Sequence, residues 1–104
     1  MENKSGLMPV GRAVLVKTYD PQTDKSIIVI PDSQKERLMS LEQRAVVVAV
    51  GNGCWPDEPA RAKVGDRVLI AKMSGYMAKG TGDGELYRIV NDRDIFALIT
   101  NEDY

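Results

Sequence analysis

The sequence predicts an all-β fold, a small irregular β-barrel, and three observations support this. Val and Ile together number 18 against 7 Leu, and β-branched side chains favour strands over helices. Short apolar runs recur along the chain between turn residues, which include nine Gly and five Pro. The length of 104 residues allows one domain with a modest core. We therefore expect a single domain over residues 1–104, built from short antiparallel strands.

Five runs of β-forming residues, each bounded by polar or turn residues, are predicted as strands. They are residues 10–17, 45–50, 67–71, 85–90 and 95–99. Val64-Gly65-Asp66 is expected to form a tight turn, and Asp83-Gly84 to form the tip of a hairpin. Residues 54–63 contain two Pro and show little periodicity, so we expect a loop there.

The run from Ser26 to Pro31 has two interpretations. Its four consecutive β-branched residues fit a buried central strand. Its flanks, however, are long and mostly polar, and long loops in a compact domain are usually functional. The run therefore also fits an exposed apolar segment that binds a partner.

Composition excludes several classes of function. The net charge of −1 argues against a nucleic-acid binder, which needs an excess of Lys and Arg. The chain has no His, which excludes imidazole catalysis and histidine metal ligation. The single cysteine, Cys54, excludes an internal disulfide and a multi-thiolate zinc site. Gly80, Gly82 and Gly84 lack the spacing of a phosphate-binding loop. We expect no catalytic residue, no metal and no cofactor.

The first residues contain no apolar signal region, and no stretch approaches the ~18 apolar residues of a membrane span. With a single thiol, a reducing cytoplasmic setting is the expectation.

Five segments, taken in order, carry a resemblance to a known family. They are Val14–Lys17, Ile28–Pro31, Val46–Gly53, Lys63–Ile70 and Arg93–Ile99. In this order they resemble the GroES (chaperonin-10) co-chaperonin family over roughly residues 9–99.

The resemblance implies a ring, typically of seven subunits, that caps a GroEL-type chaperonin and encloses unfolded client proteins. It implies a GroES-like barrel with a mobile loop, here about 18–44, and a roof hairpin. An apolar motif in that loop docks on the chaperonin. The motif corresponds to Ile28, Val29 and Ile30, flanked by Ile27 and Pro31. ATP is bound by the partner chaperonin and not by this chain.

The resemblance also implies a subunit interface. In the family, the N-terminal strand of one subunit packs near the C-terminal strand of its neighbour. These strands correspond here to about 10–17 and 93–99. The expected interface residues are Val10, Val14, Val16, Ile95, Ala97 and Ile99.

Three departures from the family pattern are visible. Ser26 and Ile27 stand where many members have Gly-Gly, and the stretch within Gln34–Arg44 is a few residues longer than usual. The segment 53–63 is shorter than the usual roof hairpin. We therefore expect a shortened roof, which would leave a wider opening at the top of the ring. A viral member that adapts a host chaperonin is one hypothesis for such a rearrangement.

Two other classes of protein stay open at this point. One is a small β-barrel module that binds nucleic acid or a peptide, although the six aromatic residues are dispersed. The other is a fragment of an alcohol-dehydrogenase-type enzyme, which would need Cys and His zinc ligands and a Rossmann domain.

Overall fold

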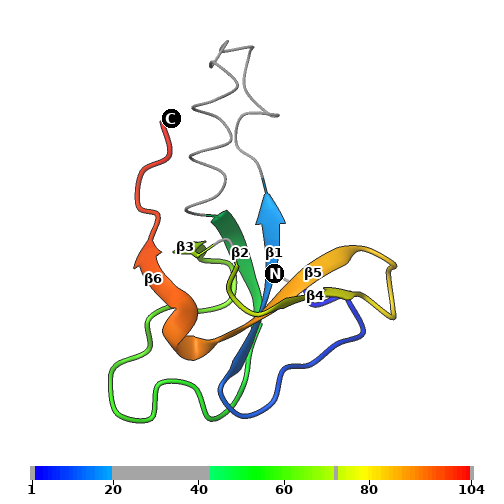
Figure 1. Ribbon diagram of the computed structural model, residues 1–104, viewed down its shortest axis with the longest axis horizontal. Helices are drawn as coiled ribbons and strands as arrows, with labels where there is room; N and C mark the ends of the chain where they lie inside the picture. Colours follow the sequence, from blue (N-terminus) through cyan, green and yellow to red (C-terminus); the bar gives the residue numbers. More distant parts are fainter. Residues whose placement is uncertain (1, 20–42, 72, 104) are drawn as a thin grey trace.

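The computed structural model describes residues 2–19, 43–71 and 73–103. Six strands and one short 3-10 helix make up the regular structure of these ranges (Figure 1). They are β1 (Ala13–Tyr19), β2 (Gln43–Val50), β3 (Arg67–Ile70), β4 (Tyr76–Lys79), β5 (Leu86–Asn91), η1 (Asp92–Asp94) and β6 (Ile95–Leu98). No helix within the described ranges is long and apolar enough to cross a membrane.

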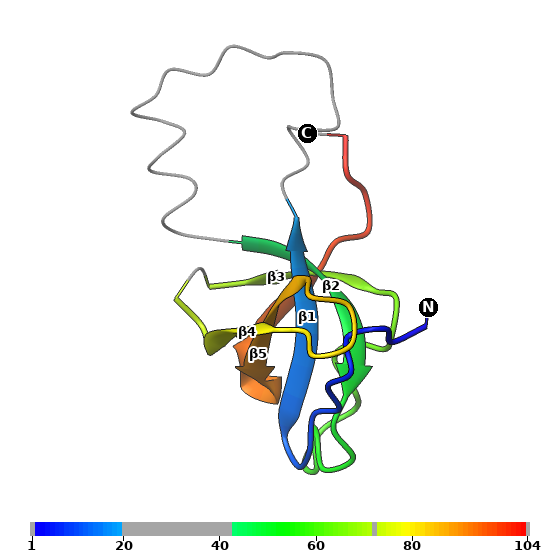
Figure 2. The ribbon, with the colours of Figure 1, turned by 90° about the vertical axis from the view of Figure 1, so that its right-hand side faces the viewer.

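The strands form one antiparallel sheet that curls into a barrel. Their order in the sheet is β4-β5-β1-β2-β3-β6, so β5 and β6 lie in different halves of the sheet. Along the chain, however, only η1 separates these two strands. The sheet must therefore bend until the end of β5 and the start of β6 come together at η1 (Figure 1 and Figure 2). Val90 of β5 and Ile95 of β6 accordingly share one buried cluster with Val14, Val47 and Val68.

The all-β prediction is confirmed, and most strand positions agree within a few residues. β1 begins at Ala13 rather than at residue 10, because Gly11 adopts φ +61° in a turn closed by the Ala13 N–H donating to Val10 O. The Lys63–Asp66 turn is present, with Gly65 at φ +94°. β4 was missed, because its residues are mostly exposed and lack a clear alternation. The run 26–31 lies outside the described residues.

β1 is buried on both faces, although an antiparallel strand often has one face exposed to solvent. Val14 and Val16 point into the barrel cluster, whereas Leu15 joins a second cluster on the outer face. Leu7 of the N-terminal segment packs against this outer cluster. The same segment is held to the β4–β5 hairpin, where the Gly82 N–H donates to Ser5 O at 2.7 Å. The N-terminal segment therefore covers β1 from outside.

A bulge explains why two consecutive residues of β2 share the outer cluster. Leu15 pairs with Ala49, but the next residue, Val16, pairs with Val47, so Val48 is the extra residue. An extra residue breaks the strict alternation of side chains between the two faces. Val48 and Ala49 can both pack on the outer face.

Gly51 and Gly53 allow the end of β2 to approach the start of β1 closely. The Gly51 N–H donates to Ala13 O and the Gly53 N–H donates to Gly11 O, both at 2.9 Å. A Cβ atom on Gly51 would lie 2.4 Å from Gly11 O and 2.8 Å from Ala13 O. These neighbours are backbone atoms, which cannot rotate away. The Val-Gly-Asn-Gly sequence thus has a structural role.

We predict that Gly51→Ala lowers the free energy of unfolding by about 1–3 kcal/mol, the usual range for an overpacked site. Gly53→Ala is the matched control, because its Cβ would meet the same backbone at 3.3 Å and should cost less. Urea denaturation of both variants measures the difference. Equal stability of the Gly51→Ala variant and the unmodified chain would contradict this packing.

Candidate functional site

The residues predicted to dock on a partner, Ile27, Ile28, Val29, Ile30 and Pro31, lie outside the described residues. The structure does describe the two strand ends that flank them. Residues 20–42 connect the end of β1 at Tyr19 to the start of β2 at Gln43. Tyr19 and Arg44 are partners in the β1–β2 ladder, so both ends of the connection leave the barrel side by side.

Glu102 of the C-terminal segment joins three strands at this end of the barrel. One carboxylate oxygen accepts a hydrogen bond from the Tyr19 hydroxyl and lies 3.1 Å from Arg44 Nη1. The other oxygen lies 2.6 Å from Arg67 Nη1. The Glu102 side chain is 12% exposed. Figures 1 and 2 both show the C-terminal segment running past the end of β1 and the start of β2. No signal in the sequence marked Glu102, because its partners are 35 to 83 residues away.

These contacts shift the pKa of both groups. The hydrogen bond from Tyr19, followed by those from Arg44 and Arg67, holds the pKa of Glu102 below its usual value. Burial, together with the hydrogen bond and the negative charge of Glu102, raises the pKa of Tyr19 to about 12. The carboxylate is therefore charged and the phenol neutral at pH 7. The cluster of Tyr19, Arg44, Arg67 and Glu102 is called the loop-base cluster below.

The connection 53–63 lies at the opposite end of β1 and folds back onto the barrel. Trp55 is buried at φ +51°, a conformation that bulky residues rarely adopt. Its N–H donates to Asp92 Oδ2 at 2.8 Å and its indole Nε1–H donates to Asp92 O at 2.9 Å. Arg61 Nη1 donates to Ile95 O at 2.9 Å. The connection contains no strand and is tied to η1 and β6.

The predicted interface residues fall into two groups. Val14, Val16 and Ile95 are fully buried in the core of their own chain, because the interior of the barrel needs their side chains. They offer no surface to a neighbour. Val10 and Ala97 are exposed, and Ile99 is partly buried.

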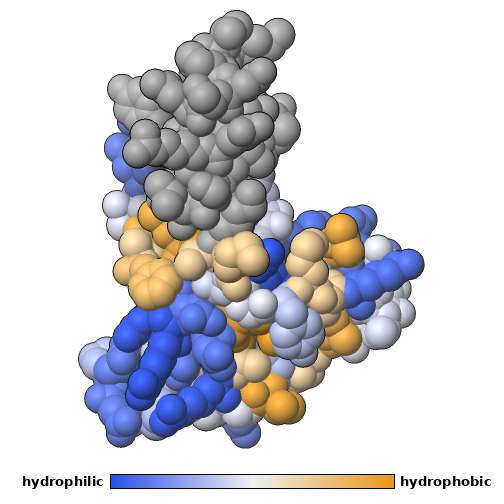
Figure 3. Space-filling view, in the orientation of Figure 1, coloured by the Kyte–Doolittle hydropathy of each residue, from blue (hydrophilic) through white to orange (hydrophobic). Residues whose placement is uncertain are grey.

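Sequence reasoning missed two residues that do offer apolar surface. Phe96 and Leu98 of β6 are 66% and 47% exposed. β6 is at one edge of the sheet. Figure 3 shows apolar residues gathered over β6 and over the β4–β5 hairpin, while the region of the 53–63 connection is hydrophilic. The alternation that places Ile95 inside the barrel could have indicated that Phe96 points outward.

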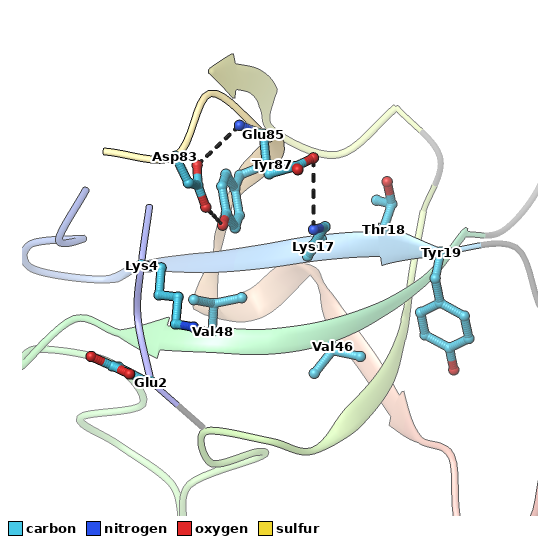
Figure 4. Close-up of a pocket in the computed structure, with 10 residues that line it drawn as sticks. All are labelled: Glu2, Lys4, Lys17, Thr18, Tyr19, Val46, Val48, Asp83, Glu85 and Tyr87. Carbon is cyan, nitrogen blue, oxygen red and sulfur yellow. Dashed lines mark hydrogen bonds and ion pairs between the residues drawn. The ribbon is translucent and has the colours of Figure 1, made fainter. Parts of the chain in front are cut away.

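A groove with a volume of about 460 Å³ lies on the outer face beside β1 (Figure 4). Val46 and Val48 line it together with charged side chains. Lys17 pairs with Glu85 at 3.9 Å and lies 5.7 Å from the centre of the Tyr87 ring. The Tyr87 hydroxyl donates to Asp83. Because these groups already pair with one another, we assign the groove no ligand.

Cys54 does not have the surroundings of a reactive thiol. Burial and the negative charge of Asp92 raise its pKa, which favours the protonated, unreactive form. Its Sγ lies 3.4 Å from Ala13 O. Within the described part of the chain, no group of three or more acidic or Cys side chains could hold a metal ion.

Comparison with known proteins identifies the family. The model described as "Chaperonin 10 Kd subunit" matches residues 6–99, which include every strand of the barrel. The chain belongs to the chaperonin 10 (GroES) family. The co-chaperonin GroES of Coprothermobacter proteolyticus is 40% identical over 101 residues, covering 92% of this chain and 97% of that protein. The co-chaperonin GroES of Methylacidiphilum infernorum is 40% identical over 98 residues, covering 89% and 93%. That of Staphylococcus aureus strain Newman is 38% identical over 98 residues, covering 89% and 98%.

The resemblance found in the sequence is thus confirmed, and so is the GroES-like barrel. The family model ends at Ile99, so Glu102 lies beyond the matched residues. The loop-base cluster joins strands of the family barrel to a segment outside the matched region.

We predict that Glu102→Gln lowers stability by about 1 kcal/mol at pH 7, since it removes a charged partner of two Arg residues. A carboxylate whose pKa is lowered by folding stabilises the fold above its unfolded pKa, and this contribution disappears as the pH falls through the folded pKa. The difference in stability between the variant and the unmodified chain should therefore shrink as the pH falls below 4.5, the usual pKa of a glutamate side chain.

Denaturant unfolding from pH 7 to pH 3 measures this convergence. Glu85→Gln is the control, because the pair formed by Glu85 and Lys17 is 60% and 49% exposed and should contribute little. A stability difference for Glu102→Gln that stays constant down to pH 3 would contradict the role of the charge.

Proposed function

We propose that this chain is a co-chaperonin that forms a ring-shaped lid on a GroEL-type chaperonin and encloses unfolded client proteins. The observation that carries the proposal is the match of the whole barrel to the chaperonin 10 family. Relatives over about 90% of the chain are named co-chaperonin GroES. This favours a co-chaperonin over a nucleic-acid- or peptide-binding module. We infer that the chain works without catalysis. We also infer that it acts in the bacterial cytoplasm or, if it is a viral protein, in the cytoplasm of the host cell.

The docking segment is proposed to be residues 26–31, in which Ile28, Val29 and Ile30 enter an apolar groove on the chaperonin. Full burial of one such side chain is worth about 1.5–3 kcal/mol, so the three supply roughly 5–9 kcal/mol. Ordering the backbone costs about 1–2 kcal/mol per residue and offsets most of this gain. One docking segment alone should bind with a dissociation constant of roughly 1 mM.

A ring overcomes this weakness through multivalency. Several docking segments on one ring raise the overall affinity by factors of about 10²–10⁴ without a new contact. Weak individual contacts also allow the lid to detach. We propose a ring of seven subunits, as in the family that the sequence resembles.

The ring interface is proposed to use exposed apolar side chains at two places. One is the edge strand β6 with Phe96 and Leu98, and the other is the N-terminal segment with Met8 and Val10, which are 72% and 77% exposed. An edge strand presents unpaired backbone groups that a neighbouring chain can pair with. The buried Val14, Val16 and Ile95 support the interface by holding these segments in place.

The connection 53–63 is proposed to form a reduced roof. It has no strand and is held on its own barrel by Trp55 and Arg61. We infer that a segment without strands and tied at two points to its own barrel reaches less far than a hairpin would. A ring of such subunits would have a wider opening at its top.

We predict that Ile28→Asp and Ile30→Asp abolish binding to a GroEL-type chaperonin in the presence of nucleotide but leave the ring intact, because a buried unpaired carboxylate costs more than the apolar contact gains. Native mass spectrometry of the protein alone and with the chaperonin reports both states. Ser33→Asp, a polar position in the same stretch, is the control and should bind. Capping by the Ile28→Asp ring would refute the assigned docking segment.

We also predict that the double variant Phe96→Asp, Leu98→Asp dissociates the ring into monomers that keep the fold, since both side chains are exposed in the isolated chain. Native mass spectrometry and circular dichroism follow assembly and fold. Lys63→Glu, an exposed charge change in the 53–63 connection, serves as the control. If the double variant still assembles, β6 is not at the subunit interface.

A further inference from the structure

The loop-base cluster holds the two strand ends from which residues 20–42 leave the barrel. Glu102 contacts Tyr19, the last residue of β1, and Arg44, the second residue of β2. Gln43 Nε2 also donates to Tyr19 O at 3.3 Å, so the two ends contact each other directly. The cluster therefore closes the sheet at the point where the connection begins and ends.

Arg67 extends the cluster to a third strand. It is the first residue of β3, and its guanidinium lies 2.6 Å from Glu102. The Ile99 N–H donates to Arg67 O at 2.8 Å, which fixes the C-terminal segment just before Glu102. The carboxylate thus sits between two cations and contacts residues of three strands. Without it, Arg44 and Arg67 would leave two like charges close together at the base of the connection.

Strand ends that separate have two effects on the connection. Each lost ladder pair adds residues to it, and a longer connection has more conformations to lose when it binds. The relative position of its two anchor residues, Tyr19 and Gln43, also becomes less defined. Both effects reduce the preorganisation on which affinity depends. In a ring with several docking segments, a small loss of affinity in each subunit is multiplied in the affinity of the whole ring.

We propose that Glu102 is a positioning residue for chaperonin docking. Through Tyr19 and Arg44 it keeps the ends of β1 and β2 together, and it thereby fixes the two anchor points of the connection that carries residues 26–31. This inference rests on the proposed co-chaperonin function. It assigns to the C-terminal segment, beyond the residues matched by the family model, a role in binding the partner.

The test compares Glu102→Gln with the unmodified protein and with Glu85→Gln. Glu85 is a carboxylate paired with Lys17 of β1, away from the strand end, and is a matched control. The readout is the affinity of each ring for a GroEL-type chaperonin with nucleotide at 25 °C, with native mass spectrometry to verify the ring. We expect Glu102→Gln to bind about tenfold more weakly with an intact ring, and Glu85→Gln to bind normally.

Hydrogen exchange provides a readout that a merely structural role would not move. In Glu102→Gln, the increase in exchange rate over the unmodified protein should be larger at the amides of residues 18, 19 and 43–45 than at those of β5. Glu85→Gln should show no such excess at these strand ends. An increase that is equal over the whole barrel, with no excess at the two strand ends, would overturn the positioning role, because the loss of global stability would then account for it. Unchanged affinity of an intact Glu102→Gln ring would overturn it as well.

A milder variant covers the case in which Glu102→Gln fails to assemble. Tyr19→Phe removes only one hydrogen bond to Glu102, so the ring should persist and bind two- to threefold more weakly. Unchanged binding by this ring would then overturn the inference. Failure of the unmodified protein to bind would instead refute the proposed function, and binding by Ile28→Asp would refute the assigned docking segment. The two failures are therefore distinguishable.

Discussion

Closure of the barrel through the three residues of η1 is the constraint on which the rest of the structure depends. Because Asp92–Asp94 is all that separates β5 from β6, the sheet must curl and enclose the side chains of five strands. Asp92 is 3% exposed and binds both the backbone and the indole of Trp55. Its N–H also donates to Arg12 O, just before β1. One short segment thus fixes the barrel, the 53–63 connection and the entry to β1.

The closed barrel separates the loop-base cluster from the 53–63 connection. At one end, Tyr19, Arg44 and Arg67 meet Glu102 where the proposed docking connection begins. At the other end, the 53–63 connection is tied to η1 by Trp55 and to β6 by Arg61. Between them, the exposed residues of β6 form an apolar edge. A subunit of a lid needs such a division, because its partner, its neighbours and its enclosed space lie in different directions.

Local patterns predicted much of the fold. The β-branched run of β2 and the turn glycine Gly65 act through backbone preferences that depend on adjacent residues only. β4 was missed because an exposed hairpin strand is stabilised by its partner, β5, and not by its own sequence. The bulge at Val48 escaped prediction for a similar reason, since it depends on the register with β1.

In the candidate site, too, some features follow from neighbouring residues and others from residues far apart in the chain. The apolar run 26–31 is a feature of the sequence alone, because four consecutive β-branched residues between polar flanks are visible without a structure. The alternation of Val14 and Val16 was equally visible, but whether their face meets the core or a neighbour depends on how the sheet curls. Glu102 finds its partners only in the folded chain, because contacts across 35 to 83 residues require the closed barrel. The sequence by itself therefore determined most of the strands and the family, and it supplied the proposed docking segment. Only the tertiary structure decided which side chains remain free for a neighbour and which hold the strand ends, since both depend on distant residues brought together by folding.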